Sequence, residues 1–156
     1  MSIMRRTTVG LLFALIILSA RPERSSALGA AVSGSGLVRG TAALAEFSVQ
    51  LDDGRSSAFS YFDFSSDPAR SFSLYDGVQV DCLGQLFGGQ TIRLTGNGSD
   101  SSAPNEPTII QVFLVDGGSS GPDRISLKAR RPDGRVVYFL PMRDLEVGEL
   151  SVNCSA

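Results

Sequence analysis

The sequence predicts an all-β domain behind an N-terminal signal peptide. Short runs of alternating apolar and polar residues recur along the chain, and residues that favour turns separate them. The segment that follows the expected signal peptide has no run of useful length with the spacing of an amphipathic helix. About nine such strands favour an antiparallel β-sandwich, and a closed meander β-barrel is the alternative.

The N-terminus has the order of charges and apolar residues that is typical of a secretory signal peptide. Arg5 and Arg6 precede the apolar run Val9–Ala20, and small residues follow it. As a helix this run would span only about 18 Å, which is short of the ~30 Å hydrocarbon core of a bilayer. We therefore expect cleavage after Ala27, or as late as Ala31, and a secreted or periplasmic protein without a stable membrane span. One all-β domain is expected over residues 34–154.

The chain that remains after cleavage is acidic. Four of the 14 basic residues and one of the 16 acidic residues precede the cut after Ala27, which leaves a net charge of −5. Because domains that bind nucleic acid are usually basic, this charge argues against a nucleic-acid partner. An envelope or extracellular protein, or a polyanion, is the partner class that we expect.

Two cysteines remain after cleavage, Cys82 and Cys154. An even count in an exported protein predicts one disulfide, with two unpaired buried thiols as the alternative. Two cysteines without any histidine cannot supply the four ligands of a zinc site. We expect no cofactor.

The first half of the domain begins with a glycine-rich start and continues with the clearest alternating strand, Ala43–Leu51. The next strand carries four aromatic residues, two on each face, which either pack in the core or, on an open face, stack on sugars. The pair Asp76-Gly77 predicts a tight hairpin turn. The expected strands are Leu37–Thr41, Ala43–Leu51, Ser57–Phe64, Phe72–Tyr75 and Val78–Leu83.

The second half contains a polar segment, Asn97–Glu106, which is expected to be a loop. Ile109–Val115 is apolar on both faces except at Gln111, as in a central strand. Arg131-Pro132-Asp133-Gly134 has the residues of a strong turn. The expected strands are Thr91–Thr95, Ile109–Val115, Ile125–Arg130, Val136–Leu140 and Glu149–Cys154.

Few residues of this chain suit catalysis. Nucleophilic hydrolysis by a Ser/His or Cys/His pair needs an imidazole, and the sequence has no histidine. The only lysine, Lys128, takes an outward position on a strand. A hydrolase with two carboxylates needs acids that face one another across a cleft, and no spacing singles out such a pair. The acids on or near strands are Glu46, Asp63, Asp81, Glu146 and Glu149.

Two neighbouring segments are candidate binding loops. In Asp116–Asp123, the acids Asp116 and Asp123 bound a stretch that contains Gly118 and Gly121, so that the loop is either a weak calcium candidate or a plain strand connection. A basic cluster follows, which would either dock a polyanion or an acidic partner, or discourage association between sheet edges. This basic cluster consists of Arg124, Lys128, Arg130, Arg131 and Arg135.

A set of short motifs resembles the exported bacterial all-β modules called post-COAP domains. The motifs are Gly34-x-Gly36, Ala45-x-Phe47-x-Val49, Tyr61-Phe62-Asp63, Leu94-Thr95-Gly96, and Val115-Asp116-x-Gly118 leading through Gly121 and Asp123 to Ile125-Ser126-Leu127. The resemblance spans residues 34–153, with Ile125 in place of an aromatic residue. This family has no settled activity, so the resemblance implies an exported β-module and no catalytic residues.

The sequence therefore favours an exported, non-enzymatic module with a binding or structural role at the bacterial envelope or in the extracellular space, its ligand unknown. A small-molecule carrier is the alternative. It would have a barrel around an apolar cavity lined by Phe59, Tyr61, Phe113 and Tyr138. The carboxylate-pair hydrolase is the third hypothesis.

Overall fold

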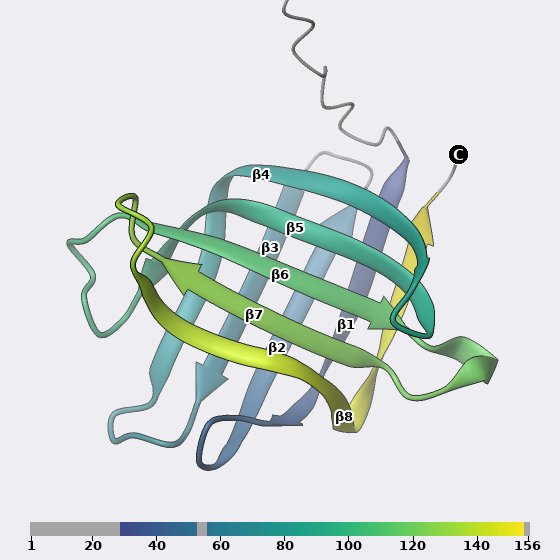
Figure 1. The fold of residues 1–156 in the computed structure, drawn as a ribbon, viewed down its shortest axis with the longest axis horizontal. Coiled ribbons are helices and arrows are strands. Elements are labelled where there is room, and N and C mark those ends of the chain that lie inside the picture. The colour runs from purple at the N-terminus through teal and green to yellow at the C-terminus, as the bar shows by residue number, and fades with distance from the viewer. Residues whose placement is uncertain (1–28, 53–55, 155–156) are drawn as a thin grey trace, which may run out of the picture.

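A computed structural model describes residues 29–52 and 56–154, and the expected signal peptide lies outside the described residues. Eight antiparallel strands follow one another around a barrel, and the first strand pairs with the last, which closes it (Figure 1). The predicted all-β class is confirmed, and the closed meander barrel replaces the preferred sandwich. The strands are β1 (Ala30–Arg39), β2 (Leu44–Asp52), β3 (Ser56–Asp63), β4 (Arg70–Leu86), β5 (Gly89–Asp100), β6 (Thr108–Asp116), β7 (Arg124–Arg130) and β8 (Val136–Cys154).

Closure depends on the length of β8. Its first part, up to Asp144, pairs with β7, and its second part, from Leu145, pairs with β1. At the bend Gly148 lies opposite Gly36, with φ at +109°, and a Cβ on Gly148 would come within 2.2 Å of the Ser35 carbonyl oxygen. Only glycine permits so close an approach in that backbone conformation. Two predicted strands, Val136–Leu140 and Glu149–Cys154, are thus parts of a single strand.

The hairpin turn predicted at Asp76-Gly77 is wrong. Residues 70–86 form one strand that pairs with β5 along its length, and its register shifts on either side of Asp76 are β-bulges. The positive φ of Gly77, +54°, serves a bulge here, because bulges need this conformation as turns do. The tight turn comes later, at Phe87 and Gly88, where φ is +54° and +85° as a type I′ turn requires.

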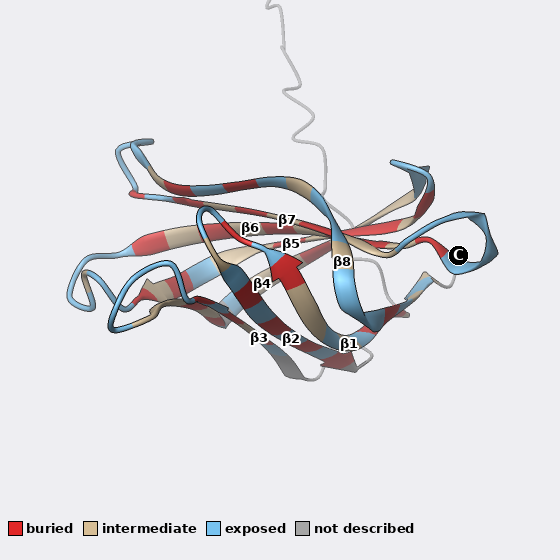
Figure 2. Cartoon of the chain, turned by 90° about the horizontal axis from the view of Figure 1, so that it is seen from below, coloured by how far each residue is buried: buried red, intermediate tan, exposed pale blue. Residues whose placement is uncertain are grey.

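Inward side chains form one core cluster in the barrel, and burial alternates most clearly along β2, β3, β6 and β7 (Figure 2). The interior of an eight-stranded barrel is wide enough for its own side chains or for one small ligand. The aromatic strand β3 serves both faces, with Phe59 and Tyr61 inside and Phe62 outside, and Phe64 in the turn after it is exposed as well. The largest fully buried side chains include Tyr61, Phe47, Phe72, Ile92, Leu94 and Ile110. Within the described residues no helix is long and apolar enough to cross a membrane.

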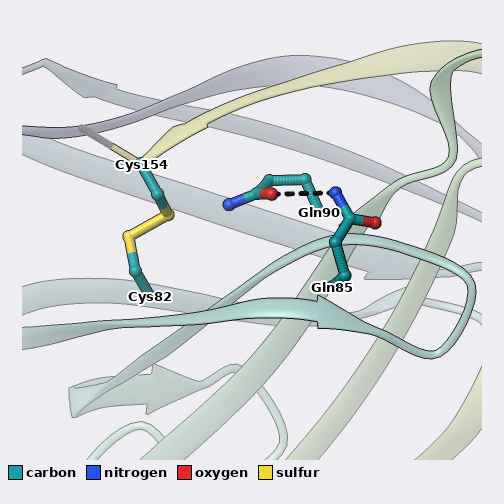
Figure 3. Close-up of a disulfide and its surroundings, with 4 residues drawn as sticks. All are labelled: Cys82, Gln85, Gln90 and Cys154. Atoms are coloured by element: carbon teal, nitrogen blue, oxygen red, sulfur yellow. Dashed lines mark hydrogen bonds between the residues drawn. A yellow bond between two sulfur atoms is a disulfide. The ribbon is translucent and has the colours of Figure 1, made fainter. Parts of the chain in front are cut away.

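The predicted disulfide is present between Cys82 of β4 and Cys154 of β8, with their Cα atoms 6.0 Å apart (Figure 3). Beside it, the side-chain amide of Gln85 donates a 3.1 Å hydrogen bond to that of Gln90 across the β4–β5 hairpin. Cys154 ends the strand that closes the barrel. The disulfide therefore holds this strand end to the opposite wall.

Replacing both cysteines, with Cys82→Ser and Cys154→Ser, should lower the free energy of unfolding by up to about 4 kcal/mol, because the unfolded chain loses a constraint on a long loop. Urea unfolding followed by circular dichroism measures this loss. The oxidised native protein should weigh two hydrogens less than the reduced protein. An equal mass before and after reduction, or an unchanged midpoint in the double variant, would contradict the assignment.

Candidate binding surfaces

The loop between β6 and β7, which contains the 3₁₀ turn Gly118–Ser120, is tied to the backbone by the two acids that bound it. Each carboxylate of Asp116 and Asp123 accepts two backbone hydrogen bonds, one within the loop and one from β8. The donors are Gly118 (2.9 Å) and Val152 (3.1 Å) for Asp116, and Gly117 (2.9 Å) and Leu150 (2.6 Å) for Asp123. Beyond Asp144, β8 no longer pairs with β7, so the N–H groups on that edge of β8 have no strand partner. The two carboxylates accept hydrogen bonds from them instead.

These hydrogen bonds give Asp116 and Asp123 a structural role. Both carboxylates already accept two N–H donors, and Gly118 and Gly121 are exposed between them. Among residues 29–52 and 56–154, no three His, Cys, Asp or Glu side chains are grouped so that they could hold a metal ion. The contacts of Asp116 and Asp123 therefore account for the pattern that suggested calcium.

The predicted basic cluster divides in the structure. Arg124 pairs with Asp144 at 2.7 Å and also donates to the Phe87 carbonyl oxygen, while Arg131 is buried. Arg135 is exposed, 3.9 Å from Glu106. Lys128 and Arg130 lie on the outer side of β7 and have no ion pair with any residue that the structure describes. The cations that remain for a polyanion are thus fewer than the sequence suggested.

One end of the barrel, where the turns β1–β2, β3–β4, β5–β6 and β7–β8 lie, holds the buried charges; we call it the polar end. There Asp100, fully buried, accepts two hydrogen bonds from Arg70 (3.1 and 2.8 Å) and one from Arg131 (3.1 Å). Arg131 also donates to the Thr108 hydroxyl, and its Nε lies 2.9 Å from Glu106 Oε2 in an ion pair without hydrogen-bond geometry. The β5–β6 loop, residues 101–107, is thereby fastened to the barrel.

Charge pairing at this end decides the ionisation of Asp100. Burial alone would raise the pKa of this carboxyl, but hydrogen bonds from Arg70 and Ser102 outweigh it and lower the pKa to about 2. The Arg70 guanidinium also lies over two aromatic rings, 4.9 Å from the centroid of Phe72 and 5.6 Å from that of Tyr138. Asp100 is therefore an anion at neutral pH, and Arg70 joins it to the aromatic core.

A second buried carboxylate at the polar end, Asp63, ends a chain of hydroxyl groups. Tyr138 donates its hydroxyl hydrogen to Asp63 Oδ2 at 2.5 Å. Because a tyrosine hydroxyl has only one hydrogen, Tyr61 is the donor in its 2.8 Å hydrogen bond with Tyr138. Burial raises the pKa of Tyr61 to about 12, and it also raises that of Tyr138. Burial would raise the pKa of Asp63 too, but hydrogen bonds from Ser65, Tyr138 and Thr41 lower it. Each group in this chain has its partner, which indicates a structural role.

The five acids considered for hydrolysis occupy different environments. Asp63 alone faces the interior, with 1% of its surface exposed, and it accepts hydrogen bonds from its neighbours. Asp81 pairs with Arg93 at 2.8 Å. On the outer face, Glu146 lies 3.4 Å from Arg39, and Glu46 and Glu149 are exposed.

The chain matches no protein-family model, no curated protein and no solved structure. Its resemblance to post-COAP domains therefore stays an expectation. What the surface can bind has to be argued from its own side chains.

One exposed area was missed by the sequence reading. Large apolar side chains gather on the outer face of β8, β1, β2 and β3 near the polar end, and we call them the apolar patch. It consists of Leu37, Leu44, Phe62, Phe64 and Val147. Of these, Leu44, Phe62, Phe64 and Val147 are 42–64% exposed. The signal for it was present in two outward aromatic residues, Phe62 near the end of β3 and Phe64 just after it.

Strand register places these residues in two rows. In one row Leu37 pairs with Val147 and with Glu46, and the exposed carboxylate of Glu46 lies between Leu37 and Phe62. In the other row Phe64 donates its backbone N–H to the Leu44 carbonyl oxygen. Directly opposite side chains on neighbouring strands lie about 5 Å apart, and the two rows meet where Leu37 and Leu44 line the same groove. This groove, of about 600 Å³, runs between Leu37, Leu44 and Val147 and the β1–β2 turn.

Replacing Asp123 by alanine should lower the free energy of unfolding by about 2 kcal/mol, because the N–H groups of Gly117 and Leu150 lose their acceptor. Glu149→Ala, which removes an exposed carboxylate of β8 next to Leu150, is the matched control and should change the free energy of unfolding little. Urea unfolding of both variants decides the matter. Equal losses in the two would contradict the capping role.

Asp100 should also make stability depend on pH. Its folded-state pKa is depressed, so its contribution of about 2 kcal/mol is present above pH ~4 and is lost as the pH falls toward 2. Asp100→Asn should be less stable than the native chain at pH 5 but should lose less stability between pH 5 and pH 2. Chemical unfolding at a series of pH values measures the two slopes. Parallel slopes would show that Asp100 does not titrate in this way.

Proposed function

We propose that this protein is an exported, non-enzymatic β-module that binds a partner protein through the apolar patch. The observation that carries the proposal is the gathering of exposed apolar side chains on one face, with Phe64 at 51% and Val147 at 64% exposure. Contiguous apolar surface of this kind marks interaction sites in soluble proteins, whereas single exposed apolar residues are ordinary.

The edge of the patch supports a protein partner. Arg39 and Glu146 pair at 3.4 Å beside the groove, and Arg143 also lines it. An apolar centre with a charged, solvated rim is the usual anatomy of a protein–protein interface. The groove adds a recess into which a side chain of the partner could insert.

Export is supported by the disulfide and by the start of the barrel. Disulfides persist in oxidising compartments, and a signal peptide directs a chain into such a compartment before it is cleaved. Ala30 is buried at the first rung of β1, opposite Cys154. Cleavage after Ala27 leaves that rung intact, whereas cleavage after Ala31 would remove it. The earlier position is therefore the one that we propose.

The carrier hypothesis gains the barrel that it needs, and three of the four lining residues that it named, Phe59, Tyr61 and Tyr138, are buried in the core, whereas the fourth is not. Phe113 lies on the outer side of β6, where its ring packs edge-on against Phe87, 6.2 Å between centroids. Tyr61 and Tyr138 face inward, but they contact one another and Phe72. These contacts favour the outer surface as the place for a ligand.

Phe64→Ser should abolish capture of the partner without unfolding the barrel, because the side chain is half exposed. The measurement is cross-linking of the tagged, exported protein in its own host, followed by mass spectrometry of the products. Phe139→Ser, at a residue of β8 that is 54% exposed, is the matched control and should retain the product. A product that survives Phe64→Ser, or that both variants lose, would overturn the proposal.

A further inference from the structure

A second groove, of about 410 Å³, lies over β4, β5 and the β5–β6 loop. Tyr75 forms one wall, and it is 65% exposed, the most exposed of the large apolar side chains in the described part of the chain. The loop segment Pro104–Pro107 forms another wall, and Asn97 of β5 also lines the groove. Nothing in the barrel's own packing requires a tyrosine ring at this position.

The loop wall is held in place before any ligand arrives. Arg131, buried beneath the loop, contacts Asp100 at the start of it and Glu106 near the end. Two further turns are closed by backbone hydrogen bonds, from Ala103 to Asp100 and from Glu106 to Ala103, each at 3.0 Å. A wall fixed in this way loses little conformational entropy when it binds, which favours affinity.

The groove offers an aromatic face beside groups that both donate and accept hydrogen bonds. The side-chain amides of Asn97 and Asn105 do both, and Glu106 Oε2 is held by Arg131 while the carboxylate is half exposed. A pyranose ring presents the complementary surface, with an apolar face of C–H groups and a rim of hydroxyls. An exposed tyrosine supplies the flat apolar contact, and amide and carboxylate oxygens receive the hydroxyls.

The charge of the groove narrows the ligand class further. No lysine or arginine lines it, and the charge of Glu106 is balanced by ion pairs with Arg131 and Arg135, so the lining offers no unpaired cation to an anionic ligand. Its lining also lacks the broad apolar area that a lipid or a large hydrophobic ligand needs. From these contacts we infer that the Tyr75 groove binds a neutral glycan built of hexopyranose units. This site is separate from the apolar patch and does not depend on the protein-binding proposal.

The experiment is isothermal titration calorimetry of the mature protein with cellohexaose, maltohexaose and mannohexaose, and with an oligomer of galacturonic acid as the anionic comparison. At least one neutral hexamer should bind with a dissociation constant in the millimolar range or below. Tyr75→Ala should weaken that binding by about tenfold or more, Asn105→Ala should weaken it as well, and Tyr75→Phe should retain it.

Two controls separate this site from the rest of the surface. Phe64→Ser removes an aromatic side chain from the apolar patch and should leave glycan binding unchanged. The thermal midpoint of Tyr75→Ala should equal that of the native chain, because the side chain is exposed. Absence of binding to all three neutral hexamers would overturn the inference. So would equal affinity in Tyr75→Ala, a loss caused by Phe64→Ser instead, or tighter binding of the galacturonate oligomer.

Discussion

Closure of the sheet by β8 is the constraint on which the other features depend. A strand of 19 residues can leave β7 and continue along β1 only if its free edge is satisfied and its end is held. Asp116 and Asp123 accept the N–H groups of that edge, and the disulfide holds its end to β4. At the bend, Gly148 and Gly36 allow the two backbones to approach. Without these contacts β8 would be an open edge, which invites pairing with other chains.

At the polar end, the buried charges are likewise matched by hydrogen-bond partners. Asp100 and Asp63 are anions inside the barrel mouth, and each is surrounded by donors from different strands and turns. A buried carboxylate is stable only when such donors are in place, so these networks fix the turns around them. The β5–β6 loop is fastened at both ends by these contacts, although its sequence is polar and contains two serines. The wall of the Tyr75 groove is therefore a consequence of how the barrel closes its end.

Period-two alternation was enough to predict the all-β class and most inward positions, because successive side chains in a strand take opposite faces. It failed at Phe113, which lies on the outer side of β6, and it divided the long strands β4 and β8 in two. It could not distinguish barrel from sandwich, since that choice depends on one strand pairing with two neighbours in turn, which no local pattern records. Asp76-Gly77 suited a bulge as well as a turn. Arg131 looked like an exposed turn residue, and its burial follows from Asp100, 31 residues away. The loop acids suggested a metal because the sequence did not reveal the backbone donors of β8.

Both candidate surfaces lie on the outside of the barrel, and they occupy different strands. The apolar patch lies over β8, β1, β2 and the end of β3, and the Tyr75 groove lies over β4, β5 and the β5–β6 loop. The two surfaces share no residue. A barrel with two such surfaces can hold a protein on one and a glycan on the other. Together the two proposals describe a bridging module, and this role needs neither a cavity nor a catalytic group.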